Sequence, residues 1–146
     1  MKFICDAPGS KSWFWIETEA EAALETDTMG HAVEKHFAQA WQAAAKTYRA
    51  VPGPFIEQDI GLKAHIQTLM PMFLTLRCWD GQALATAMLP PRGRYDPACR
   101  IIIVGPANRD PYPEHGEAIR ELGEHFGLTL DRVACYPYAG VAASRK

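Results

Sequence analysis

Apolar and polar residues alternate at the start of the chain, which predicts a β-hairpin. Residues 2–5 and 12–16 are rich in aromatic and β-branched side chains, and residues 8–10, which read Pro-Gly-Ser, supply a turn between them. Thr18 and Glu21 follow in the spacing of a capping box. A short helix is therefore expected to begin directly after the second strand.

The clearest helical pattern covers residues 29–49. Its apolar side chains recur every three or four positions, so we expect a surface helix that packs an aromatic stripe against the core. This stripe comprises Val33, Phe37, Trp41, Ala44, Ala45 and Tyr48. Residues 52–54 read Pro-Gly-Pro and are expected to end the helix, because proline cannot continue one. Residues 60–68 fit either a strand or a helix, and their strong helix formers favour the helix.

A second hairpin is predicted over residues 73–89. Two apolar runs, 73–79 and 82–89, are joined by Asp80-Gly81. Because this pair of residues tolerates positive φ angles, it favours a tight type I′ turn.

The C-terminal part of the chain predicts a strand-helix-strand unit. Residues 101–104 are a continuous β-branched run, typical of a strand covered on both faces, and we expect this strand to lie centrally. A helix should follow from about residue 114 to 126, with Gly127 as its terminating residue. A last strand is predicted near residues 132–136, and residues 139–146 are predicted to be a flexible tail.

These elements together predict the fold class α+β. The expected sheet is mostly antiparallel, has about five strands from two hairpins plus a C-terminal β-α-β unit, and carries its helices mainly on one face. Residues 1–138 are predicted to be a single domain. The chain has 146 residues, 48% of them apolar, and at this length a core is stable without a metal or a disulfide. We therefore expect no cofactor.

Charge and hydropathy exclude several classes of partner. The formal net charge is −2 and the pI is about 6.2, which argues against nucleic acid because there is no overall positive field. No run of residues is long and apolar enough to span a membrane, and the first sixteen do not resemble a signal peptide, so we expect a cytoplasmic protein without a membrane partner. The cysteines form no Cys-x-x-Cys pair and are expected to be reduced. They are Cys5, Cys78, Cys99 and Cys135.

The loops on either side of the 101–104 run form the first candidate site. Open α/β sheets bind ligands at the carboxyl end of a central strand, beside a helix N-terminus, and arginine side chains suit phosphate or carboxylate groups. The candidate residues for a small anionic ligand are Arg92, Arg94, Asn108, Arg109, Asp110 and His115, with Arg100 nearby. The alternative is that the arginines are solvated and Asp110 only caps the helix. Pro106 follows Gly105 and lacks an N–H donor, which argues against a familiar phosphate-binding loop.

The histidines and cysteines form no recognisable metal or nucleophile motif. His31 and His36 would lie about 140° apart around one helix and could not bind the same ion, so no metal is predicted. No Gly-x-Ser-x-Gly motif is present, and the sequence identifies no catalytic residue.

Trp13 and Trp15 share one face of the first predicted hairpin. Aromatic side chains placed in this way either pack beneath a helix or bury themselves against a partner chain, and we treat both residues as a candidate interface for self-association. The favoured hypothesis is a non-catalytic binding or homo-oligomerisation module. The alternative is a small enzyme or binding protein for an anionic metabolite that uses residues 92–115.

Overall fold

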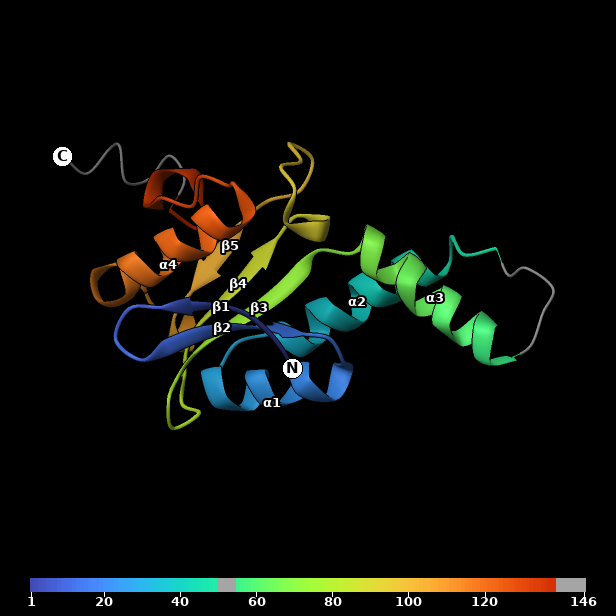
Figure 1. Cartoon of the computed structure of the whole chain (residues 1–146), viewed down its shortest axis with the longest axis horizontal. Helices are drawn as coiled ribbons and strands as arrows, with labels where there is room; N and C mark the ends of the chain where they lie inside the picture. Colours follow the sequence, from blue (N-terminus) through green and yellow to red (C-terminus); the bar gives the residue numbers. More distant parts are fainter. Residues whose placement is uncertain (50–54, 139–146) are drawn as a thin grey trace.

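The computed structural model describes residues 1–49 and 55–138 (Figure 1). Two predictions, the Pro-Gly-Pro helix end at residues 52–54 and the flexible tail at 139–146, lie outside the described residues. The strands are β1 (Lys2–Ala7), β2 (Lys11–Ile16), β3 (Met72–Cys78), β4 (Ala83–Leu89) and β5 (Ile102–Val104). The helices are α1 (Glu19–Met29), α2 (Val33–Ala45), α3 (Phe55–Leu69) and α4 (Tyr112–Phe126). Three short 3₁₀ turns are η1 (Pro91–Gly93), η2 (Pro106–Asn108) and η3 (Arg132–Ala134).

The five strands form one antiparallel sheet in the order β1-β2-β3-β4-β5. Every strand therefore pairs with its neighbour in the sequence, and α1, α2 and α3 are inserted between β2 and β3. The predicted α+β fold, with a mostly antiparallel sheet of about five strands, is confirmed. The ambiguous segment at 60–68 is helical, as favoured, within α3.

Helices cover both faces of the sheet. α4 packs on one face, where its residues Ile119 and Leu122 belong to one core cluster with Trp13, Leu74 and Ala87 of the sheet. α1, α2 and α3 belong to the other face, where a second cluster joins apolar residues of these helices to the sheet. Figure 1 shows α1 and α4 on opposite sides of the sheet, with α2 and α3 extending away from it. None of the described helices has the length and apolar character needed to cross a bilayer.

The helix predicted over residues 29–49 differs from the structure at its N-terminal end. The predicted capping box is present, since the Thr18 side chain accepts from the Glu21 N–H and the Glu21 carboxylate accepts from the Thr18 N–H. The helix it opens continues to Met29, where Gly30 adopts a left-handed conformation with φ of 69° and ends it. The predicted start of the helix at residue 29 is therefore wrong, because α2 begins only at Val33.

The β3–β4 turn differs from the predicted type I′ turn. Only Gly81 of the pair has a positive φ, at 87°. The Gly81 N–H donates to the carbonyl of Cys78, and the Asp80 carboxylate accepts from the Gln82 N–H at 3.0 Å. The chain thus turns through three residues, and the Asp80 side chain stabilises the loop instead of a second positive φ angle.

The C-terminal unit departs most from the prediction. β5 lies at an edge of the sheet, although its β-branched run was expected at the centre. The segment predicted as a last strand forms η3 instead, and in the described part of the chain its backbone pairs with the sheet through one parallel bridge between Tyr136 and Ile102. The bridge covers part of the outer edge of β5 and so pairs backbone groups that an edge strand would otherwise leave exposed.

Candidate functional site

A buried carboxylate lies between α1 and the sheet. Glu25 has no exposed surface, and its Oε1 accepts a hydrogen bond from Arg77 Nη2 of β3 at 2.9 Å. Its Oε2 accepts from the Thr86 hydroxyl of β4 at 2.5 Å. Burial of a charged group is costly unless it is paired and hydrogen-bonded, and this carboxylate is both. The network fixes α1 on the sheet and fixes the direction of the Thr86 hydroxyl.

Sequence reasoning missed this network, although part of the signal was present. Ala22, Glu25 and Met29 are the buried residues of α1, and their spacing places Glu25 in the apolar stripe of the helix. Its partners Arg77 and Thr86 lie far along the chain, so only the folded sheet brings the three together.

A cavity of about 470 Å³ opens beside the network, and we call it the sheet-face cavity. It lies between the start of α2 and the β4–β5 side of the sheet. Its apolar lining includes Phe73, Met88, Ile102 and Val104, while Thr86, His31 and Asn108 contribute polar groups. Ala32, Val33, His36, Tyr136 and Pro137 complete its described lining. An apolar hollow of this size with a few polar groups has the character of a small-molecule site.

His31 lies on the connection between α1 and α2, directly after the residue that ends α1. The hydroxyl of Thr26 accepts from the Glu34 N–H at 2.8 Å and ties the two helices together, which holds this connection in place. Burial lowers the pKa of His31 below its ordinary value, and the carboxylate of Glu25 opposes this shift only in part. Its ring is therefore neutral near pH 7.

The Nε2 atom of His31 is buried and has no hydrogen-bond partner among the described residues. Buried polar atoms normally have one, so this nitrogen marks a place where a ligand or a water molecule is expected to bind. The prediction that His31 and His36 diverge on one helix rested on a helix that includes both. In the fold His31 precedes α2, and both rings line the sheet-face cavity.

The cavity offers binding chemistry but no assembled reaction centre. Within residues 1–49 and 55–138, no group of three histidine, cysteine or acidic side chains could hold a metal ion. Within the described lining of the cavity, the Thr86 hydroxyl lies next to a carboxylate, but that carboxylate, Glu25, is itself paired with Arg77. Both oxygens of Glu25 therefore already accept hydrogen bonds, one from Arg77 and one from Thr86.

The arginines predicted to bind an anion do not meet the other candidates. Arg92 and Arg94 are exposed at η1, which packs against α3, and Gly93 between them lies against the Phe126 ring at the end of α4. His115 is in the first turn of the same helix, about 16 Å away along its axis at the usual rise per residue. This distance exceeds the span of one small anion and its ligands.

The remaining candidates also point to different neighbours. Asn108 lines the sheet-face cavity, while the Arg109 Nε donates back to the carbonyl of Pro106 at 3.2 Å. Asp110 accepts from the Tyr112 N–H at the start of α4 and from Arg132 Nε at 2.9 Å, but the N-cap residue of the helix is Pro111. The six residues therefore do not converge on one site.

His115 lines a separate polar cleft of about 480 Å³ beside the β1–β2 turn. Lys11 Nζ lies 3.1 Å from His115 Nδ1, and burial and this ammonium together lower the pKa of His115. The described lining also carries Glu114, Glu117 and Arg120, so charges of both signs surround the cleft.

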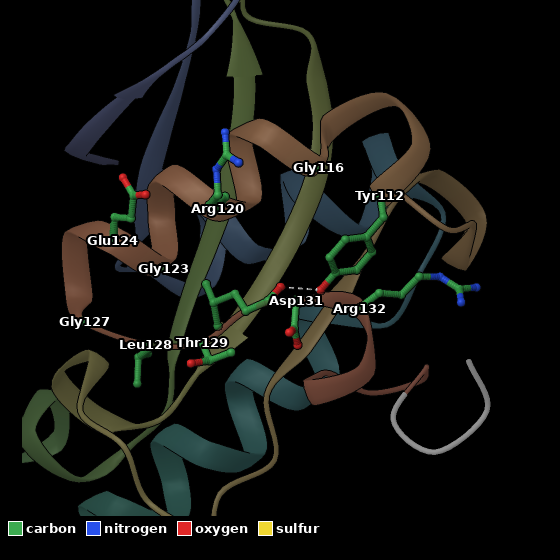
Figure 2. A pocket seen from close by; sticks show the side chains of 11 residues that line it. Tyr112, Gly116, Arg120, Gly123, Glu124, Gly127, Leu128, Thr129, Asp131 and Arg132 are labelled. Atoms are coloured by element: carbon green, nitrogen blue, oxygen red, sulfur yellow. Dashed lines mark hydrogen bonds between the residues drawn. The ribbon is translucent and has the colours of Figure 1, made fainter. Parts of the chain in front are cut away.

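A third hollow, also of about 480 Å³, lies between α4 and the segment after it (Figure 2). Figure 2 shows Arg120 and Glu124 on the helix and the hydroxyl of Tyr112 pointing to the opposite wall, where it donates to the Leu130 carbonyl at 2.8 Å. Its charged groups have opposite signs and Arg132 is already paired with Asp110. This groove therefore has less to offer a ligand than the sheet-face cavity.

Trp13 is unsuited to the interface role predicted for it. It is fully buried within its own chain, and its Nε1 donates to the Ala118 carbonyl of α4 at 2.8 Å. Trp15 is half-buried at the margin of the same cluster, with the ammonium of Lys2 5.9 Å from its ring centroid. The aromatic strand therefore serves mainly to dock α4, the alternative that the sequence had left open.

Comparison with known proteins identifies no relative: no family model matches the chain, and no curated protein or solved structure matches it significantly.

Proposed function

We propose that this protein is a non-catalytic binding protein that holds a small molecule in the sheet-face cavity. The observation that carries the proposal is the unpartnered, buried Nε2 of His31 beside an apolar hollow of about 470 Å³. Ligand sites are typically concave and mostly apolar, with a few fixed polar groups that orient the ligand.

The network beneath the cavity supports this proposal because it provides rigidity. Thr86 is held by Glu25, and Glu25 is held by Arg77, so the polar part of the floor is fixed before any ligand arrives. A preorganised site loses less conformational entropy on binding, which raises affinity. An ordinary structural ion pair would stabilise the fold equally well, but it would not require a hollow next to it.

A fragment screen tests the proposal. Neutral, anionic and cationic aromatic fragments would be added at millimolar concentration and followed by ¹⁵N–¹H NMR. We expect at least one to shift the amide signals of His31, Thr86 and Val104 together. His36→Trp should weaken that binding at least tenfold, because His36 is exposed and lines the cavity, so a large ring there blocks it.

His125→Trp is the matched control, since His125 is exposed near the end of α4 and does not line the cavity. It should leave binding unchanged. The proposal is refuted if no fragment shifts the cavity signals, or if the two tryptophan variants weaken binding equally.

Binding of a small anion is the second candidate, and one contact favours it. Lys11 has no carboxylate within ion-pair distance among the described residues, and its ammonium faces His115 in the polar cleft. Titration with inorganic phosphate should then shift the His115 ring signals, and Lys11→Met should abolish that response. A response that survives the Lys11 substitution would count against this candidate.

The expected cytoplasmic location is retained as a proposal, supported by the free thiols of the chain. All four cysteines are unpaired, and Cys135 is fully buried in the α4 core cluster. Free, buried thiols are typical of proteins kept in a reducing compartment.

A further inference from the structure

The polar atoms around the sheet-face cavity differ in what they can offer a ligand. Thr86 uses its only proton in the hydrogen bond to Glu25, so its oxygen has lone pairs left but no free donor. The direction of this bond is fixed because a carboxylate paired with an arginine can only accept. Thr86 therefore presents an acceptor.

His31 offers a second acceptor. The neutral ring carries one proton, on Nδ1 or on Nε2. Because Nε2 has no partner among the described residues, the proton belongs on Nδ1, and Nε2 carries a lone pair. Thr86 and His31 thus have the same character, whereas the third polar group of the lining, the Asn108 amide, can both donate and accept.

Charge adds a second constraint. No lysine or arginine is found among the described residues that line the cavity. The carboxylate of Glu25 is already neutralised by Arg77, and Arg100 stacks on the ring of Tyr136, with its guanidinium carbon 4.4 Å from the ring centroid. A carboxylate or phosphate bound beside Phe73 and Val104 would lose its hydration without gaining a cation, which is strongly unfavourable.

We infer that the sheet-face cavity selects a neutral, mainly apolar molecule that donates a hydrogen bond through an N–H or O–H group, and that it rejects anions. This inference rests on the proposed function, because it names the class of ligand for the same cavity. The donor group would reach Nε2 of His31, and the apolar body would lie on the side chains of Phe73, Met88, Ile102 and Val104.

Three indole probes test this selection by NMR titration. Indole has an N–H donor, 1-methylindole has the same ring system without the donor, and indole-2-carboxylate has the donor and a negative charge. We expect indole to bind about tenfold more tightly than 1-methylindole, the effect of leaving one buried acceptor unsatisfied. Indole-2-carboxylate should bind at least tenfold more weakly than indole.

Two variants connect the preference to His31. His31→Phe keeps an aromatic ring and removes the acceptor, so the preference for indole over 1-methylindole should fall to about one. His125→Phe replaces an exposed histidine away from the cavity and should leave the preference intact. The amide spectrum shows whether each variant is folded, and the comparison of probes on the unmodified protein decides the question even if His31→Phe does not fold.

The outcomes separate the two proposals. Equal affinities for indole and 1-methylindole, with shifts confined to the cavity, overturn the donor selection but leave a binding protein. Tighter binding of indole-2-carboxylate also overturns it and favours an anionic ligand. If neither these probes nor any fragment perturbs the cavity, both proposals fail.

Discussion

Two threonines that face each other across neighbouring strands should respond oppositely to the same substitution. Thr75 of β3 pairs with Thr86 of β4 in the antiparallel register, and both side chains are buried. The hydroxyl of Thr86 donates to Glu25, whereas the hydroxyl of Thr75 has no partner among the described residues. Replacement by valine exchanges the hydroxyl for a methyl group and keeps the shape of the side chain.

Thr86→Val should lower the free energy of unfolding by about 1.5–3 kcal/mol, the usual contribution of a hydrogen bond to a charged group. Glu25 would keep only its bond to Arg77 and has no access to water, so no solvent molecule replaces the lost donor. For a chain of 146 residues the entropy of unfolding is about 0.3 kcal/mol/K, so a loss of 2 kcal/mol lowers the melting midpoint by about 6 °C.

Thr75→Val should leave stability unchanged or raise it by up to about 1 kcal/mol, because it removes a buried polar group that gains nothing from the fold. Urea unfolding of the unmodified protein and both variants measures the difference. Thr86→Ser, which keeps the hydroxyl, should recover most of the loss. Equal destabilisation by the two valine variants would refute the reasoning, because it would show that the hydrogen bond to Glu25 contributes nothing beyond local packing.

Three further perturbations follow from the same structure. The pKa of His31 is lower in the folded than in the unfolded protein, so the unfolded state binds more protons between the folded-state pKa and about 6.5. The free energy of unfolding should therefore fall as the pH drops through this window. Urea unfolding at several pH values measures this fall, which should be shallower in His31→Gln. Lys11→Met should raise the pKa of His115, measured by NMR titration of its ring, and an unchanged pKa would contradict the repulsion between the two groups. Gly93→Ala should cost at least about 2 kcal/mol in urea unfolding, because Gly93 has φ of 66° and an added Cβ would lie 2.2 Å from the Phe126 ring; wild-type stability would contradict this close packing.

Local features of the fold were predictable because neighbouring residues determine them. The capping box at Thr18 and Glu21, the helix that ends at Gly127 and the β3–β4 hairpin each depend on a few adjacent side chains. The misread helix start was local too. Glycine commonly ends helices, and Gly30 does so here. Apolar residues nevertheless recur at helical spacing on both sides of it, so the pattern did not indicate the break.

The candidate site could not be predicted because its residues come from three separated segments. Glu25 meets Arg77 and Thr86 only when α1 docks on β3 and β4. Neither the charges nor the spacing of these residues along the chain predicts that contact. The candidate residues for an anion site are also separated by the fold. His115 lies at the start of α4, whereas Arg92 lies in η1, next to Gly93, which packs against Phe126 at the far end of that helix.

The insertion of α1, α2 and α3 between β2 and β3 has a consequence for the order of folding. Hairpins β1–β2 and β3–β4 close short loops, whereas the pairing of Ile16 with Phe73 must bring together the two ends of the whole helical insertion. The entropy cost of closing a loop rises with its length, and contacts between distant residues slow folding. The pairing of β2 with β3 is therefore the step that joins two hairpins into one cooperative sheet. Helix α1 follows β2 directly, and its Glu25 is hydrogen-bonded to β3 and β4, so this helix is placed to stabilise that pairing.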